Sequence, residues 1–127
     1  FPASKVSDND LLTVGGITLR CIHTPGHTPG HTCFYIEDKE ILFSGDHILF
    51  DITPNISVWR NIPYSLADYL ESLQKIKGVK VSHTFPGHRE FHGDIHDRIN
   101  PKTCKSLIHP PTDHLINLLS DNFIFPI

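Results

Sequence analysis

Short apolar runs separated by polar or glycine-rich breaks dominate the first part of the chain. Residues 11–14 and 17–22 are rich in aliphatic and β-branched side chains, and the Gly15-Gly16 pair between them is typical of a hairpin. Residues 32–36 and 41–44 form a second pair of apolar runs around a polar turn. We predict a strand over each run. Because the runs are almost continuously apolar, strands covered on both faces are favoured over strands covered on one.

One amphipathic helix is predicted over residues 66–77. Its apolar side chains recur at helical spacing along one stripe, made of Leu66, Tyr69, Leu70, Leu73 and Ile76. Ser65 is the expected N-cap, because Asp68 follows three positions later as in a capping box. Gly78 is the expected stop.

A short strand is expected after this helix. Residues 79–85 lead into the corner Pro86-Gly87-His88. The order of strands, helix and strand predicts an α/β or α+β domain, with one helix packed on a mixed sheet.

The composition is that of an ordinary globular domain. The chain has 127 residues, 39% of them hydrophobic, and a net charge of −3. It is too short for two domains, and its acidic balance disfavours a nucleic-acid-binding role. No apolar run approaches the roughly 18 residues of a membrane helix. Three cysteines without C-x-x-C spacing favour reduced thiols and a cytoplasmic location.

Histidine is the compositional outlier, with ten residues. Three of them, His23, His27 and His31, form a histidine ladder in the stretch HTPGHTPGH, whose Pro-Gly pairs exclude a helix. Four extended residues span about 13 Å, whereas each imidazole on a zinc ion must approach to about 2 Å. We interpret one ladder histidine as a metal ligand and the other two as supports. A hydrogen-bonded loop without metal is the alternative.

Two further motifs carry polar side chains at the ends of predicted strands. Asp46 follows residues 41–44 in the stretch SGDH, and His88 follows the last strand in FPGH. Sheets display ligands and catalytic groups at such positions. Most aspartates at strand ends, however, only cap turns.

Together, the segments TPGHTPGH, LFSGDHIL and FPGH resemble the C-terminal half of the metallo-β-lactamase superfamily. The resemblance covers about residues 11–92 and implies half of an αββα sandwich. It also implies that His27, Asp46 and His88 are metal ligands, with Asp46 bridging two ions, and that His23 and His31 support them. The stretches GDHIL and ITPNI look closest to a hydroxyacylglutathione-hydrolase-like branch.

The resemblance implies a metal-dependent hydrolase of small molecules. Such enzymes cleave ester, thioester, amide or phosphodiester bonds with a metal-activated hydroxide. Zinc is the expected cofactor, with iron or manganese as alternatives. His47 is expected either to line the substrate pocket or to hydrogen-bond the loop beside Asp46.

One family signature is missing from the chain. The signature H-x-H-x-D-H supplies the remaining ligands and the acid–base aspartate, and the nearest match, residues 92–96, has the wrong spacing. We therefore assign no catalytic residue here, and we expect residues 1–100 to be half of a domain that is inactive alone. A second copy or the missing N-terminal half is expected to cover its apolar strands.

Two alternatives remain open at this stage. A chain without the signature could be a non-catalytic remnant that acts as a structural or interaction module. Residues 101–127 depart from the family pattern and are expected to form a tail with helical potential, either divergent or read in a shifted frame. That tail could instead fold back over the apolar strands.

Overall fold

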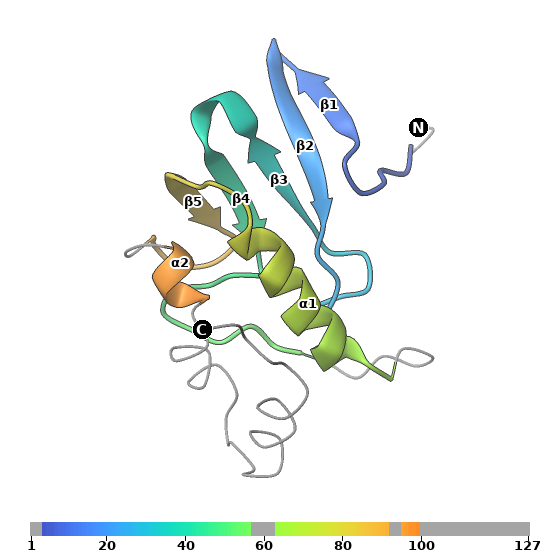
Figure 1. Ribbon diagram of the computed structural model, residues 1–127, viewed down its shortest axis with the longest axis vertical. Helices are drawn as coiled ribbons and strands as arrows, with labels where there is room; N and C mark the ends of the chain where they lie inside the picture. The colour runs from blue at the N-terminus through green and yellow to red at the C-terminus, as the bar shows by residue number, and fades with distance from the viewer. Residues whose placement is uncertain (1–3, 57–62, 92–94, 100–127) are drawn as a thin grey trace.

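The computed structural model of this chain describes residues 4–56, 63–91 and 95–99. Within them, five strands form one sheet in chain order (Figure 1). The strands are β1 (Leu11–Val14), β2 (Ile17–His23), β3 (Thr32–Ile36), β4 (Ile41–Gly45) and β5 (His83–Pro86). The first four pair antiparallel, and β5 lies parallel to β4. The predicted mixed sheet and α+β class are confirmed.

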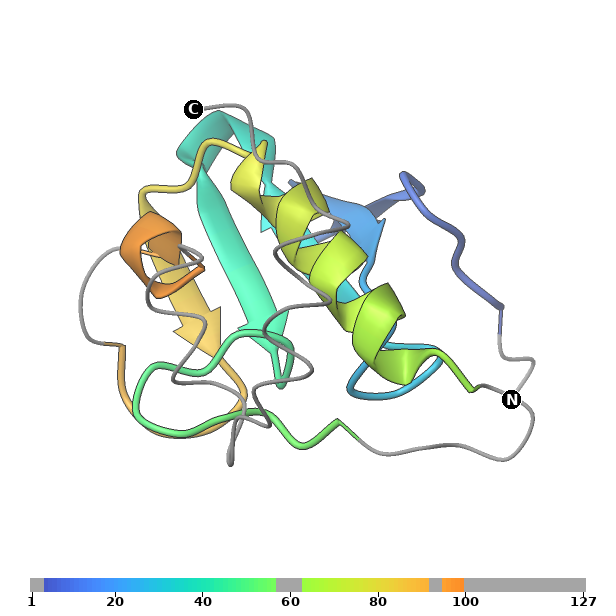
Figure 2. The ribbon, with the colours of Figure 1, turned by 60° about the horizontal axis from the view of Figure 1, so that its bottom comes forward.

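Three helical segments accompany the sheet in the described residues. They are η1 (Glu37–Lys39), a 3₁₀ turn between β3 and β4, α1 (Ser65–Lys77), and α2 (Ile95–Arg98). α1 runs diagonally across one face of the sheet, and α2 lies beside β5 (Figure 2). None of these helices has the length and hydrophobicity that a membrane crossing requires.

The predictions for β1 to β4 are confirmed to within one residue, whereas β5 begins at His83, four positions after the start of the predicted run. β2 continues to His23 and β4 to Gly45, one position beyond each predicted end. Gly15 and Gly16 have φ angles of 57° and 80°, the positive values that a tight hairpin between twisted strands requires.

The capping prediction for α1 is wrong. Tyr64 is the N-cap and makes no side-chain capping hydrogen bond, whereas Ser65 is already helical and only 4% exposed. Burial of Ser65 against the core therefore overrides its capping preference. Gly78 ends the helix as predicted, in a right-handed conformation. α2 was not predicted, because four residues are too few for a helical period to show.

The core lies between the sheet and the helices. Its buried members are Ile22, Cys33, Tyr35, Leu42 and Ile48 from the sheet and the loop after β4, with Tyr69, Leu73, Ile76, Ile95 and Ile99 from the helical side. Strand alternation sends every second side chain to this face. The helices therefore cover one face of the sheet.

The opposite face carries a row of aromatic side chains. Strand register places Phe34 beside Phe43 and Phe43 beside Phe85, and we call these three the phenylalanine row. Phe43 is 40% exposed and Phe85 is 51% exposed, and their rings stack with centroids 5.4 Å apart. On this face Cys21, the register partner of Phe34, is buried, whereas Phe43 and Phe85 stay exposed. Cover on both faces therefore stays a prediction. The tail, residues 101–127, lies outside the described residues.

Candidate metal centre

Three loops meet at one edge of the sheet. β2 and β4 each pair antiparallel with β3, and β5 is parallel to β4, so all three strands end at the same edge. The histidine ladder, Asp46 and His88 each follow one of these strand ends. The topology therefore gathers the three predicted motifs.

The Asp46 carboxylate lies between two imidazoles. Its Oδ2 is 3.5 Å from Nε2 of His27, and its Oδ1 is 3.3 Å from Nε2 of His88. The side chain of His27 is 24% exposed and that of His88 is 63% exposed. The structure thus brings together the three residues predicted as ligands.

The corner before His88 leaves no room for a side chain. A Cβ on Gly87 would lie 2.5 Å from Oδ1 of Asp46. The Gly87 amide also donates to the Gly45 carbonyl at 2.8 Å, which joins the two corners. The Asp46 carboxylate can therefore occupy this position only because residue 87 is a glycine.

A backbone carbonyl fixes the orientation of the His27 ring. Nδ1 of His27 donates to the Asn55 carbonyl at 2.7 Å. A neutral imidazole with its proton on Nδ1 has a free lone pair on Nε2, the nitrogen that faces Asp46. Metal-binding histidines are commonly held in this way.

The loop that supplies the Asn55 carbonyl is anchored by α2. Arg98 donates from Nε to the Leu49 carbonyl at 2.6 Å and from Nη2 to the Ile52 carbonyl at 3.1 Å. Neither Asn55 nor Arg98 was predicted. Asn55 acts through its backbone, so no residue type signals it, and Arg98 lies 49 positions from the carbonyl it binds.

The other two ladder histidines hold the loop around His27. His23 donates from Nε2 to the Pro29 carbonyl at 3.0 Å, and Nδ1 of His31 is hydrogen-bonded to Oγ1 of Thr24 at 2.8 Å. Burial, followed by the nearby His27 ring, lowers the pKa of His31. These contacts agree with the role predicted for His23 and His31, that of holding the loop around the ligand, which stays a prediction.

His47 is buried in the protein core. Its side chain is 0% exposed, and burial lowers its pKa to about 3, so the ring is neutral at pH 7. Neither ring nitrogen makes a hydrogen bond in the described part of the chain, although the Ser72 backbone is close enough to favour the protonated form slightly. The expectation that His47 either lines the substrate pocket or hydrogen-bonds the loop stays a prediction.

The donor set at this edge fits a divalent metal chemically. Imidazole nitrogen and carboxylate oxygen are ligands that zinc takes. Both N···O separations also exceed the roughly 2.7–2.9 Å of a charge-assisted hydrogen bond. Among residues 4–56, 63–91 and 95–99, however, no group of three or more His, Cys, Asp or Glu side chains is arranged so that it could hold a metal ion. That His27, Asp46 and His88 are metal ligands therefore stays a prediction.

Comparison with known families identifies relatives of this fold. The family described as "Metallo-beta-lactamase superfamily" matches residues 2–88. Among solved structures, a metallo-beta-lactamase family protein from Thermus thermophilus superposes with a TM-score of 0.75 and 29% identity. That match covers 91% of this chain and 38% of the other.

Two curated relatives are similar over most of this chain. The "Beta-lactamase-like protein 2 homolog" of Caenorhabditis elegans is 36% identical over 82% of this chain and 32% of its own length. An "Atrochrysone carboxyl ACP thioesterase" of Aspergillus fumigatus is 32% identical over 65% of this chain and 24% of its own. The chain thus spans about a fifth to a third of the curated relatives it matches.

Proposed function

The chain belongs to the metallo-beta-lactamase superfamily, and we propose that it supplies His27, Asp46 and His88 to the divalent-metal site of a hydrolase. The observation that carries the proposal is the position of one carboxylate between two imidazole Nε2 atoms, at 3.5 and 3.3 Å. Zinc is the favoured metal, with iron or manganese as alternatives. Two ions bridged by Asp46 would use both carboxylate oxygens.

The residues around the site have separate tasks in this proposal. A divalent metal bound there would lower the pKa of water, so that hydroxide is available at neutral pH. Asp46 directs one oxygen to each imidazole, and the Asn55 carbonyl, which accepts from Nδ1 of His27, selects the tautomer of the neutral ring whose Nε2 lone pair faces Asp46. His88, 63% exposed, marks the side from which a small substrate would approach.

The proposed substrates are esters, thioesters or phosphodiesters. Similarity to a protein named as an acyl-carrier-protein thioesterase favours the thioester class. The hydroxyacylglutathione-hydrolase-like branch, suggested by GDHIL and ITPNI, is consistent with that class. Cys21 and Cys33 are free thiols, which supports a reducing compartment such as the cytoplasm.

We further propose that residues 1–100 form the C-terminal half of a catalytic domain. The chain spans 32% and 24% of two curated relatives, and Phe43 and Phe85 of its phenylalanine row stay exposed in the described residues. The N-terminal half would cover this row and supply the remaining ligands and the acid–base aspartate. Residues 101–127 would lie outside that half-domain.

The 127-residue chain alone is expected to hydrolyse esters and thioesters negligibly, because part of the ligand set is absent. Isothermal titration with zinc should show a single weak site, and the His88→Ala variant should lose it. Robust turnover that co-purifies with the chain through successive columns would contradict the half-domain proposal. A wild-type chain that takes up no zinc, iron or manganese would contradict the metal proposal and favour a structural or interaction module.

The chain is also expected to associate in solution. Burial of apolar surface is worth roughly 25 cal/mol per Å², so an exposed aromatic row favours a partner surface, either a second copy or the N-terminal half. Light scattering should give a mass above that of a monomer, and replacing Phe43 and Phe85 together with serine should lower it. Tyr64→Ser is the control, because Tyr64 is 72% exposed at the far end of α1. A monodisperse wild-type monomer would contradict this expectation and favour the folded-back tail.

A further inference from the structure

We infer that Tyr69 and Ser72 on α1 are positioning residues that set the separation of His27 and Asp46. The inference rests on the proposed function, since it concerns the same site. Each residue acts through a hydrogen bond to the backbone of one ligand-bearing loop.

Two buried hydroxyls of α1 donate to the two loops. Ser72 donates from Oγ to the Pro25 carbonyl at 2.9 Å, two residues before His27. Tyr69 donates from its hydroxyl to the His47 carbonyl at 3.0 Å, one residue after Asp46. A single helix therefore holds the backbone beside both ligands.

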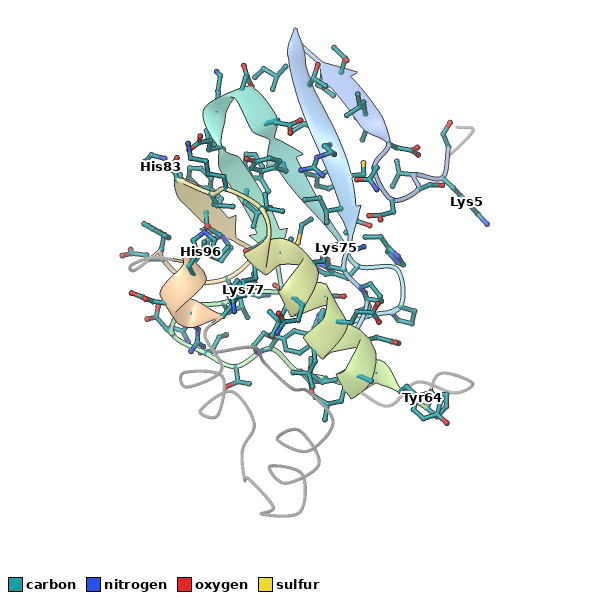
Figure 3. All side chains as sticks on the ribbon, viewed as in Figure 1. Lys5, Tyr64, Lys75, Lys77, His83 and His96 are labelled. Carbon is teal, nitrogen blue, oxygen red and sulfur yellow. The ribbon has the colours of Figure 1, made fainter. Side chains whose placement is uncertain are left out.

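The positions of these donors along α1 explain how one helix reaches both loops. Residues three apart lie on the same side of a helix and are displaced by about 4.5 Å along its axis. Lys75, three residues beyond Ser72, continues the series by donating to the His23 carbonyl at 2.8 Å. Figure 3 shows Lys75 beside the end of β2, where the ladder begins. Three donors in a row thus contact backbone next to the site.

Burial makes the two hydroxyl bonds effective restraints. Tyr69 is 4% exposed and Ser72 is 3% exposed, so water cannot readily replace either donor. The loop also lies directly on the helix, since a Cβ on Gly26 would clash with Cβ of Tyr69. The His47 ring packs edge-on to Tyr69, with ring centroids 4.9 Å apart. The loops therefore have little freedom to move relative to α1.

The first test compares zinc affinity in Tyr69→Phe and Ser72→Ala with that in Tyr35→Phe. Tyr35 is a matched control because it is 3% exposed and its hydroxyl also donates to a backbone carbonyl, that of Lys80, away from the site. We expect Tyr69→Phe and Ser72→Ala each to weaken zinc binding about tenfold, the lower end of the loss typical of outer partners. The zinc affinity of Tyr35→Phe should stay within about twofold of that of wild type. Its urea midpoint of unfolding should nevertheless fall as much as that of Tyr69→Phe. Equal losses of zinc affinity in both tyrosine variants would overturn the inference.

A second test needs no metal and separates the inference from the proposed function. In the metal-free chain, NMR should show that Tyr69→Phe shifts the Asp46 carboxyl carbon and that Ser72→Ala shifts the His27 ring nitrogens. Tyr35→Phe should shift neither. If wild type takes up no metal, the proposed function fails, whereas unchanged resonances in both α1 variants overturn the inference itself. If Tyr69→Phe does not fold, the His27 resonances of Ser72→Ala still test the inference, because this variant removes only one small hydroxyl.

Discussion

Asp46→Asn is expected to weaken zinc binding by the chain more than about 100-fold, beyond the roughly 10–100-fold that outer partners of a metal site contribute. Asp46 is the one carboxylate that faces both His27 and His88 among the described residues, at 3.5 and 3.3 Å. Asparagine has nearly the same shape as the Asp46 side chain, but it lacks the negative charge and one of the two ligand oxygens. Competition against a chromophoric zinc chelator measures the loss.

The matched control is Asp38→Asn, which removes the same charge from an exposed position in η1. Net charge changes equally in the two variants, so a general electrostatic effect on zinc would weaken both. We expect Asp38→Asn to bind like wild type, and both variants to unfold within about 1 kcal/mol of it, as is usual for residues outside the core. Equal zinc affinities of Asp46→Asn and wild type would show that Asp46 is not a zinc ligand.

The fold of the described residues could largely be predicted from the sequence. Apolar runs bounded by glycine or polar turns located β1 to β4 to within one residue, because strand length and turn chemistry are local properties. The helix stripe located α1 for the same reason. Ser65 and α2 were missed, since burial of Ser65 and docking of a four-residue helix depend on contacts distant in sequence.

The candidate site could be predicted only in part. His27, Asp46 and His88 stand out in short motifs, and the topology brings them to one edge of the sheet. The residues that hold them do not stand out. Tyr69 belongs to an ordinary apolar stripe, and its hydroxyl reaches a carbonyl 22 positions away. For His47 the sequence left two expectations open, lining the pocket or hydrogen-bonding the loop, and it gave no sign that the ring is fully buried.

The ladder itself shows what the sequence leaves undecided. Gly26 and Gly30 occupy equivalent places in the doubled motif TPGHTPGH, so sequence alone treats them alike. In the structure, Gly26 has a φ of +134° and lies against α1, whereas nothing lies within 4 Å of a Cβ on Gly30. The two glycines should therefore respond differently to the same substitution.

Gly26→Ala is expected to destabilise the protein by about 2–6 kcal/mol, of which about 1–3 comes from the strained φ and about 1–3 from overpacking. The clash is with Cβ and the backbone of Tyr69, whose Cα would be 2.5 Å from the new methyl group, so no side-chain rotation relieves it. Since whole domains are stable by only about 5–15 kcal/mol, much of the chain should unfold at low urea. Urea titration followed by circular dichroism measures the difference.

Gly30→Ala provides the matched control within the same repeat. Its new methyl group meets open space and its backbone is outside the left-handed region, so alanine should change stability by less than about 1 kcal/mol, with any gain arising from a less flexible unfolded chain. Losses of similar size in the two variants would show that the ladder does not pack on α1 through Gly26. A large loss confined to Gly26→Ala would place the first Pro-Gly corner, and with it His27, firmly against the helix.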